Sequence, residues 1–259
     1  MLVAAKEAGV DSVYRIGGAV AIAAMAFGTE TIPKVLKIVG PGGPIVTAAK
    51  IALVSEVAID MHAGPSEVLI LADRYANPDF IAADLLAKLE HSPEAAGVLV
   101  TDSWSLAKKV KYEMENQIKA RTRKEIIKQS TAKYSAIIVS ENLWSAIDFV
   151  NEYAPEHLEI MTKYPNRVLS KINNAASIFI GRYAPVAIGD YATGTNHVLP
   201  TGQGAKAYSP VSVETFMKRM QFQSLTRNGL RELSDIVNVL GKVEGFEGHV
   251  HSVNIRLKS

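Results

Sequence analysis

The stretch from Gly189 to Pro200 concentrates residue types that can do chemistry. Its letters, GDYATGTNHVLP, place the carboxylate of Asp190 and the imidazole of His197 in a segment without a helical or strand period. Loops that carry such groups between rigid elements are common places for binding and catalysis. The alternative is a turn-rich connection whose polar side chains hydrogen-bond their own backbone, and this stretch alone leaves both interpretations open.

Two other patterns carry residue types suited to proton transfer or metal binding. Glu156 and His157 are adjacent at the expected entry of a strand. Both groups titrate in the working range once perturbed, so the pair suits a general base and a general acid, although a bare Glu-His dipeptide is common. Lys88 and His91 are three residues apart in an expected helix, so their side chains share one face.

These stretches resemble, in order and in spacing, the motifs of the histidinol dehydrogenase family. The matching segments are AGPSEVL at 63–69, LLAKLEH at 85–91, APEHL at 154–158 and GDYATGTNHVLPT at 189–201. The resemblance covers essentially the whole chain but only part of the family's usual length, because the N-terminal portion of the family is missing here. Thr195, before Asn196 and His197, is the histidinol-type form of the loop and argues against a relative that acts on another alcohol.

The resemblance implies oxidation of L-histidinol through an aldehyde to L-histidine, with two hydride transfers to NAD and a bound zinc. The implied site residues are His91, Asp190 and His249 for zinc, Glu156 and His157 for catalysis, and Ser66, His197 and Glu244 for the substrate. In the family the C-terminal tail reaches into the partner subunit's site, which predicts a homodimer that exchanges its tails. Each assignment has an alternative. Ser66 could be a turn serine that hydrogen-bonds the backbone, and Glu244 and His249 could be solvated residues on a small terminal helix.

The chain departs from the family pattern near the expected metal and cofactor sites. Lys88 stands where the family has a glutamine that reaches the zinc, and an ammonium repels a dication unless it is deprotonated. Asp84, four residues earlier, offers Lys88 a surface salt bridge instead. Val20 and Gly43 replace side-chain amides that the family associates with NAD.

These departures keep two other hypotheses open. One is a shortened paralogue that binds zinc and a small imidazole or amino ligand without dehydrogenase turnover. The weaker one is a broken reading frame without an independent function.

Strand-like and helix-like segments alternate along the chain, which predicts an α/β fold. We expect mostly parallel sheets with flanking helices, in incomplete Rossmann-like domains, and a helical C-terminal tail. The expected strands are 13–16, 35–39, 57–61, 67–72, 97–101, 136–139, 158–161 and 176–180, and the expected helices include 19–27, 78–91, 104–118, 143–153, 213–217 and 228–240. The expected parts are 1–66, a remnant of the cofactor-side domain; 67–206, the main domain with the zinc and substrate motifs; and 207–259, the tail.

Glycines at 17–18 and 40–43 fall at strand-to-helix turns, where they could cradle a phosphate or only permit a tight turn. Neither turn has the dinucleotide fingerprint, so the pattern alone indicates a nucleotide only weakly.

Composition limits the classes of protein that this chain could belong to. It has 259 residues, 48% of them hydrophobic, which is enough for sizeable cores. A net charge of +2 indicates no strong field toward nucleic acid or membranes, and the absence of cysteine excludes disulfides and thiolate metal sites. No apolar run reaches the roughly 18 residues of a membrane span, and the first residues resemble a helix more than a signal peptide. These features predict a cytoplasmic protein.

Overall fold

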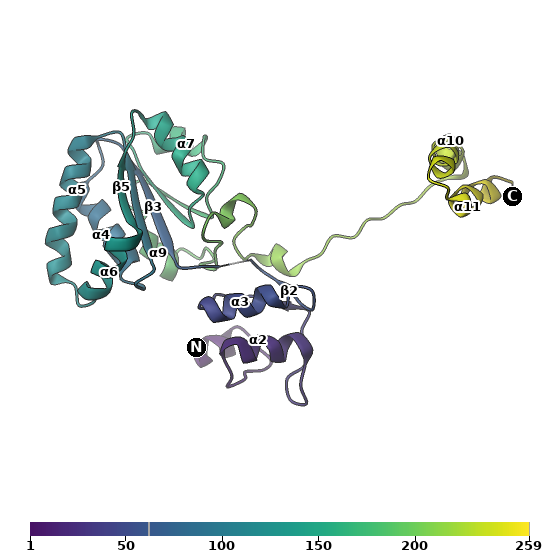
Figure 1. The fold of residues 1–259 in the computed structure, drawn as a ribbon, viewed down its shortest axis with the longest axis horizontal. Coiled ribbons are helices and arrows are strands. Elements are labelled where there is room, and N and C mark those ends of the chain that lie inside the picture. Colours follow the sequence, from purple (N-terminus) through teal and green to yellow (C-terminus); the bar gives the residue numbers. More distant parts are fainter. Residues whose placement is uncertain (62, 259) are drawn as a thin grey trace. The chain divides into compact units, whose positions relative to one another are not determined.

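The structure is a computed structural model that describes residues 1–61 and 63–258 (Figure 1). His62, to which the sequence assigned no role, lies outside the described residues. The chain divides into two compact units, Met1–Phe216 and Met217–Ser259, and each is described by itself. The expected three-part division stays a prediction.

The first unit is built around a five-stranded parallel sheet with the strand order β5-β4-β3-β6-β7. The strands are β3 (Glu67–Ala72), β4 (Ala96–Thr101), β5 (Ser135–Val139), β6 (His157–Met161) and β7 (Ser177–Ile180). Val68 of the central strand pairs with Gly97 on one side and with His157 on the other. The chain therefore winds outward from β3 in one direction and then returns to add β6 and β7 on the other side.

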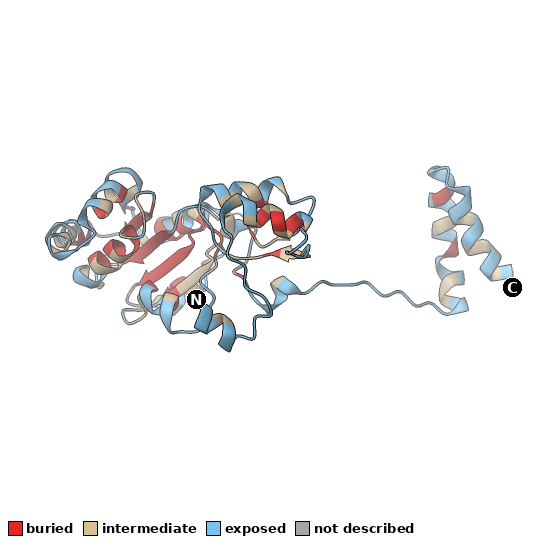
Figure 2. Ribbon diagram, turned by 90° about the horizontal axis from the view of Figure 1, so that it is seen from below, coloured by how far each residue is buried: buried red, intermediate tan, exposed pale blue. Residues whose placement is uncertain are grey.

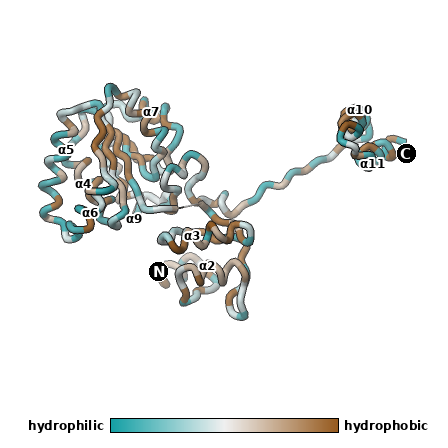
Figure 3. The backbone as a smooth tube through the Cα atoms, viewed as in Figure 1, coloured by the Kyte–Doolittle hydropathy of each residue, from teal (hydrophilic) through white to brown (hydrophobic). Residues whose placement is uncertain are grey.

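Helices cover both faces of this sheet (Figure 1). They are α4 (Pro78–Leu89), α5 (Trp104–Gln117), η1 (Ile118–Ala120), α6 (Lys124–Tyr134), α7 (Leu143–Tyr153), α8 (Pro165–Leu169) and α9 (Val186–Tyr191). Val68 and Ile70 pack with residues of α4, α5 and α9, whereas Leu69 and Leu71 pack with residues of α7 and α8. Because both faces of β3 are covered, its sequence is an almost unbroken apolar run. The central strands β3, β4 and β6 are accordingly buried, and the sheet is hydrophobic (Figures 2 and 3).

A smaller layer precedes this sheet. It contains α1 (Leu2–Glu7), α2 (Gly18–Phe27), β1 (Lys37–Ile38), α3 (Pro44–Ala52) and β2 (Ala58–Ile59), with β1 and β2 parallel. The strands expected at 35–39 and 57–61 shorten to two residues each, and the strand expected at 13–16 does not form. Val13, Tyr14 and Ile16 are exposed, so no packed face stabilises an extended pairing there.

The signature stretch differs from the expected loop at its start. Residues Gly189 to Tyr191 belong to the short helix α9, which begins after Pro185 with the buried Val186. The rest of the stretch is irregular. Two further short helices follow, η2 (Gly204–Lys206) and η3 (Val213–Phe216), the second at the helix expected over 213–217.

The second unit is a pair of helices, α10 (Arg227–Val243) and α11 (Glu247–Lys258). The Thr226 side chain caps α10 by accepting a hydrogen bond of 3.1 Å from Gly229 N–H. The helices approach closely at Gly241, where a Cβ atom would lie 2.7 Å from Cγ2 of Val250.

These elements confirm the predicted α/β class, parallel sheets, flanking helices and helical tail. No described helix is long and apolar enough to cross a membrane.

Candidate active site at the amino ends of β3 and β6

The Glu156 carboxylate lies where the chain enters β6, and it is buried. Its Oε2 atom accepts hydrogen bonds from Ser66 Oγ at 2.8 Å and from Glu67 N–H at 2.7 Å. Burial opposes ionisation, but the hydrogen bond and charge of His157, the backbone contact and the Lys88 charge together hold the pKa of Glu156 below its ordinary value. A buried carboxylate with this many donors remains ionised.

His157 is the first residue of β6, and its ring is held at one nitrogen. Nδ1 lies 3.0 Å from the Glu67 carbonyl oxygen and 3.2 Å from Oε2 of Glu156. Because a carbonyl oxygen only accepts, Nδ1 carries a hydrogen, and Nε2 is the nitrogen available for proton exchange. Nε2 lies 3.8 Å from Oδ1 of Asp190, too far for a direct hydrogen bond.

Asp190 reaches this site because α9 packs tightly against β7. A Cβ atom on Gly189 would lie 2.5 Å from the ring of Phe179, so only glycine permits this approach. The Phe179 ring in turn stacks on His157, with centroids 6.0 Å apart. The first N–H of the helix, at Val186, donates to the Glu159 carboxyl of β6 at 2.9 Å.

Lys88, on α4, contributes a buried ammonium to the same place. Its Nζ atom donates to Ser66 Oγ at 3.2 Å and lies 3.9 Å from Oδ2 of Asp190. The surface salt bridge considered for Lys88 and Asp84 is therefore wrong, because the Lys88 side chain is buried and its ion pair is with Asp190. Lys88 belongs to the buried face of α4, so its side chain lies inside the protein and not on the surface.

A cavity of about 340 Å³ brings most of the predicted site residues together. Its lining includes Ser66, Lys88, His91, Glu156, His157, Asp190 and His197. His91 lies at the rim, where partial burial and then the Lys88 charge lower its pKa. The volume is within the usual range of small-molecule sites.

The residues expected near the cofactor contribute less to this cavity. Pro41 and Gly42 line it, whereas Val20 and Gly43 do not belong to its described lining. The 40–43 turn is braced by Asp60, which accepts from Gly40 N–H at 2.7 Å and pairs with the buried Lys50. Thr47 of α3 donates to the Ala63 carbonyl at 2.8 Å and so ties this layer to the loop before Ser66.

Two carboxyl residues that support the site, Glu67 and Glu159, were not singled out from the sequence, and a third, Asp84, was considered only as a surface partner of Lys88. Glu67 accepts from Tyr153 Oη at 3.1 Å, from Gly202 N–H at 3.1 Å and from Glu156 N–H at 3.3 Å, and burial raises its pKa. Burial also raises the pKa of Glu159, which the negative charge of Asp84 raises further, and burial raises the pKa of Asp84 to about 6. The available signal was a lone carboxyl in an apolar strand, as in EVLILA and HLEIM.

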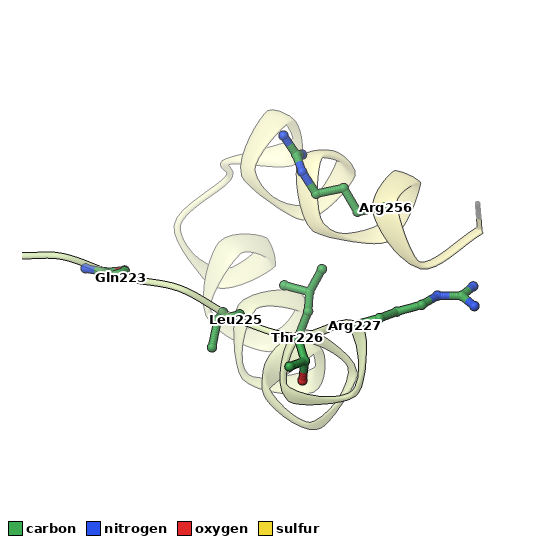
Figure 4. Close-up of a pocket in the computed structure, with 6 residues that line it drawn as sticks. Gln223, Leu225, Thr226, Arg227 and Arg256 are labelled. Atoms are coloured by element: carbon green, nitrogen blue, oxygen red, sulfur yellow. The ribbon is translucent and has the colours of Figure 1, made fainter.

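Glu244 and His249 belong to the second unit. Glu244 is the C-terminal cap residue of α10, and His249 lies on α11, where its ring stacks on Phe246 with centroids 5.1 Å apart. Their approach to the cavity stays a prediction. A separate open cavity of about 640 Å³ in this unit is lined by Gln223, Leu225, Thr226, Arg227, Leu230 and Arg256 and contains neither residue (Figure 4).

The arrangement in the first unit is suited to proton transfer on a polar ligand. It combines an ionised carboxylate, an imidazole with one open nitrogen, a hydroxyl and an ammonium in one cavity. Among the described residues, no group of three or more His, Cys, Asp or Glu side chains is placed to hold a metal ion. His91 and Asp190 nevertheless line the same cavity and offer one nitrogen and one carboxylate.

Comparison with known proteins adds the family relationship. Residues 1–257 match the sequence model of the family described as histidinol dehydrogenase. The chain is 52% identical to the histidinol dehydrogenase of Methanothermobacter thermautotrophicus over 258 residues, which are 100% of this chain and 61% of that protein. It is 50% identical to that of Methanocaldococcus jannaschii, with 99% and 59% covered.

A solved structure agrees with these sequence matches. The crystal structure of histidinol dehydrogenase from Elizabethkingia anophelis superposes with a TM-score of 0.94 at 42% identity, covering 98% of this chain and 59% of that one. The chain thus spans about three fifths of the length of the relatives that it matches.

Proposed function

Because this chain belongs to the histidinol dehydrogenase family, we propose that it oxidises L-histidinol to L-histidine with NAD as the hydride acceptor. The observation that carries the proposal is the pair of Glu156 and His157. The Glu156 carboxylate lies beside Nδ1 of His157, and Nε2 of His157 is left for proton exchange on the side of Asp190. The alternative of a non-oxidising paralogue is not favoured, because the matched relatives carry the dehydrogenase name.

The dyad would serve two oxidation steps. In the first, His157 Nε2 takes the proton of the substrate hydroxyl while the carbon gives a hydride to NAD, which leaves an aldehyde. After His157 has released this proton to solvent, water adds to the aldehyde in the second step and the dyad takes a proton from the water. The carbon of the resulting hydrate anion then gives a hydride to a second NAD, which leaves the carboxylic acid. The Glu156 carboxylate, 3.2 Å from Nδ1, stabilises the imidazolium that forms in each step and assists the activation of water.

Substrate contacts are assigned to Ser66 and His197, which line the cavity, and to Glu244 of the tail. NAD would lie on the N-terminal layer beside the 40–43 turn, at the Pro41 and Gly42 rim. Val20 and Gly43 occupy the family's NAD-contact positions without an amide side chain. We therefore expect NAD binding to be weaker than in relatives that keep those amides.

Zinc is proposed as the metal, because nitrogen of histidine and oxygen of aspartate are donors that zinc accepts. His91 and Asp190 supply two such donors to one cavity, and His249 of the tail would supply the third. When bound, zinc would act as a Lewis acid and as a template for the imidazole and amine of the substrate. The proton transfers described above belong to protein side chains alone.

A homodimer is proposed because the tail has an unpartnered apolar stripe. Leu233, Ile236, Leu240 and Val243 follow one another at helical spacing on α10, and all are exposed within the described chain. A second copy would cover the stripe while its own tail brings Glu244 and His249 to the first copy's cavity. The proposal includes a cytoplasmic location, where NAD is available.

The test uses the whole chain with L-histidinol and excess NAD, and it follows the absorbance of NADH. Calorimetry with histidinol measures binding separately from turnover. We expect NADH production that falls by a factor of about 10² or more in Glu156→Gln and His157→Asn, as is usual for a lost acid–base group. Histidinol binding without NADH in a folded sample would contradict the dehydrogenase proposal and support the ligand-binding alternative.

A further inference from the structure

The Lys88 side chain is a buried cation in the middle of the donor set. Only 3% of the side chain is exposed, and Nζ lies 3.2 Å from Ser66 Oγ and 3.9 Å from Oδ2 of Asp190. Lysine is almost never buried without a partner, because removing an ammonium from water is costly. The partner that the structure supplies is the carboxylate proposed as a zinc ligand.

The ammonium acts on more than one group of the site. Burial opposes the ionisation of Glu156, and the Lys88 charge joins the hydrogen bond and charge of His157 in lowering the pKa of that carboxyl. Burial and then the Lys88 charge lower the pKa of His91. The ammonium also donates to the Ser66 hydroxyl, which donates onward to Glu156 at 2.8 Å. The Lys88 ammonium therefore interacts with Asp190 directly and with Glu156 through the Ser66 hydroxyl.

A zinc ion would need the same carboxylate. A dication near Asp190 would lie within a few ångströms of Nζ, where the repulsion between unscreened charges in a partly buried site is large. Zinc and the ammonium therefore exclude each other, unless the lysine side chain moves away from Asp190.

We propose that Lys88 is a built-in cation of this site, which holds Asp190 and Ser66 in place without metal and competes with zinc for Asp190. The inference deepens the proposed zinc site and rests on it. It adds that Lys88 sets the metal affinity of this chain, and that zinc binding displaces the ammonium from Asp190.

The first measurement is zinc affinity, by equilibrium dialysis of the whole chain against zinc buffered with a chelator. Lys88→Gln and Lys88→Met both remove the charge, but methionine is not one of the cysteine, histidine and carboxylate ligands that zinc usually takes in proteins. Competition predicts that both variants bind zinc more tightly than the parent chain, by about tenfold or more. If Lys88 were instead a neutral ligand, Lys88→Met would bind more weakly.

The second measurement is the midpoint of thermal unfolding, with and without zinc. Without metal, both variants should unfold at a lower temperature, because Asp190 and Glu156 lose their cation. With zinc, the unfolding midpoint of both variants should rise more than that of the parent chain, because tighter binding of a ligand to the folded state raises its stability more. The matched control is Lys50→Gln, which removes another buried lysine paired with an aspartate, Asp60. This control should lower stability without changing zinc affinity.

The outcomes separate this inference from the zinc proposal. Equal zinc affinity in the parent chain and both Lys88 variants would overturn competition while leaving the zinc site intact. Weaker zinc binding by Lys88→Met would also overturn it. No zinc binding by any of the chains would overturn the zinc site and the competition together, whereas NADH production does not enter either measurement.

Discussion

The backbone N–H of Val186 donates a hydrogen bond of 2.9 Å to Oε1 of Glu159, a side chain that is 1% exposed within β6. This bond anchors the start of α9 to the sheet. Because Asp190 lies on the same short helix, the anchor also sets where its carboxylate meets Lys88 and His157.

Glu159→Ala should therefore loosen α9 as well as destabilise the chain. The variant leaves a buried N–H without its acceptor, which costs about 1–3 kcal/mol of unfolding free energy. Glu159→Gln keeps an acceptor oxygen and should retain the parent stability at acidic pH. Chemical unfolding and histidinol calorimetry measure the two effects. An equal loss of stability in Glu159→Ala and Glu159→Gln would show that the carboxyl group itself, and not the hydrogen bond to Val186, stabilises the chain.

The same carboxyl predicts a pH dependence. Burial raises the pKa of Glu159 and raises that of Asp84 to about 6, so the folded state binds more protons than the unfolded state. Their contribution to stability is fully present below the ordinary carboxyl pKa and is lost as pH rises through the raised values. The Lys88 charge opposes the shift at Glu159 but does not reverse it.

We expect the unfolding free energy of the parent chain to fall relative to that of Glu159→Gln as the pH rises from about 4 to about 8. Denaturant titrations across this range measure the difference. Glu141→Gln, an exposed carboxyl outside the pair, is the control and should run parallel to the parent. A constant difference between parent and Glu159→Gln would mean that the pair titrates normally.

Gly189→Ala should damage the site through packing. Its new methyl group would lie 2.5 Å from the Phe179 ring, so either the ring or α9 must move. Overpacking of this kind costs about 1–3 kcal/mol, and it should weaken histidinol binding because Asp190 shifts. Gly248→Ala is the control, since a Cβ atom there meets nothing within 4 Å and alanine favours a helix. Unchanged stability of Gly189→Ala would mean that α9 is not tightly held.

The cofactor side offers a gain of function. Gly43 caps α3 in an extended conformation, with nothing within 4 Å of a new Cβ atom, so Gly43→Asn should be accommodated and also suits a helix cap. Together with Val20→Gln it returns two amides, each worth about 0.5–1.5 kcal/mol, and should tighten NAD binding by about tenfold. Fluorescence titration measures this. A change in folding but not in NAD affinity would show that NAD binds elsewhere.

The sheet was predictable because its strands are short apolar runs separated by helices, and two of the four motifs, AGPSEVL and APEHL, fall at strand entries. Ser66, Glu156 and His157 lie near one another because β3 and β6 are parallel neighbours that begin at the same edge of the sheet, a strand order that the sequence did not predict. The helix α9 could not be predicted, because six residues form a helix only through tertiary contacts such as Glu159 and Phe179. The burial of Lys88 was not predicted. The helical pattern places Lys88 on one face of α4, but its partner there is Asp190, far later in the chain, and local spacing does not predict that contact.

The last prediction concerns exchange of the tail. If Glu244 and His249 serve the partner's site, a chain defective in its own cavity and a chain defective in its tail should complement each other. Mixing His91→Ala with His249→Ala after subunit exchange creates dimers in which one site combines an intact cavity with an intact tail. Zinc content and histidinol binding should then recover, to at most one site per mixed dimer.

The control mixture pairs Glu244→Ala with His249→Ala. Both defects lie in the tail, so every mixed site lacks one tail residue and histidinol binding should not recover, although sites with the Glu244→Ala tail keep His249 for zinc. Recovery of histidinol binding in both mixtures would show that the tail residues are dispensable. No recovery in the first mixture, with subunit exchange verified by labelled chains, would mean that each tail serves its own cavity or none. Recovery in the first mixture alone is the outcome that tail exchange requires, because only there does one dimer contain an undamaged cavity and an undamaged tail on different chains.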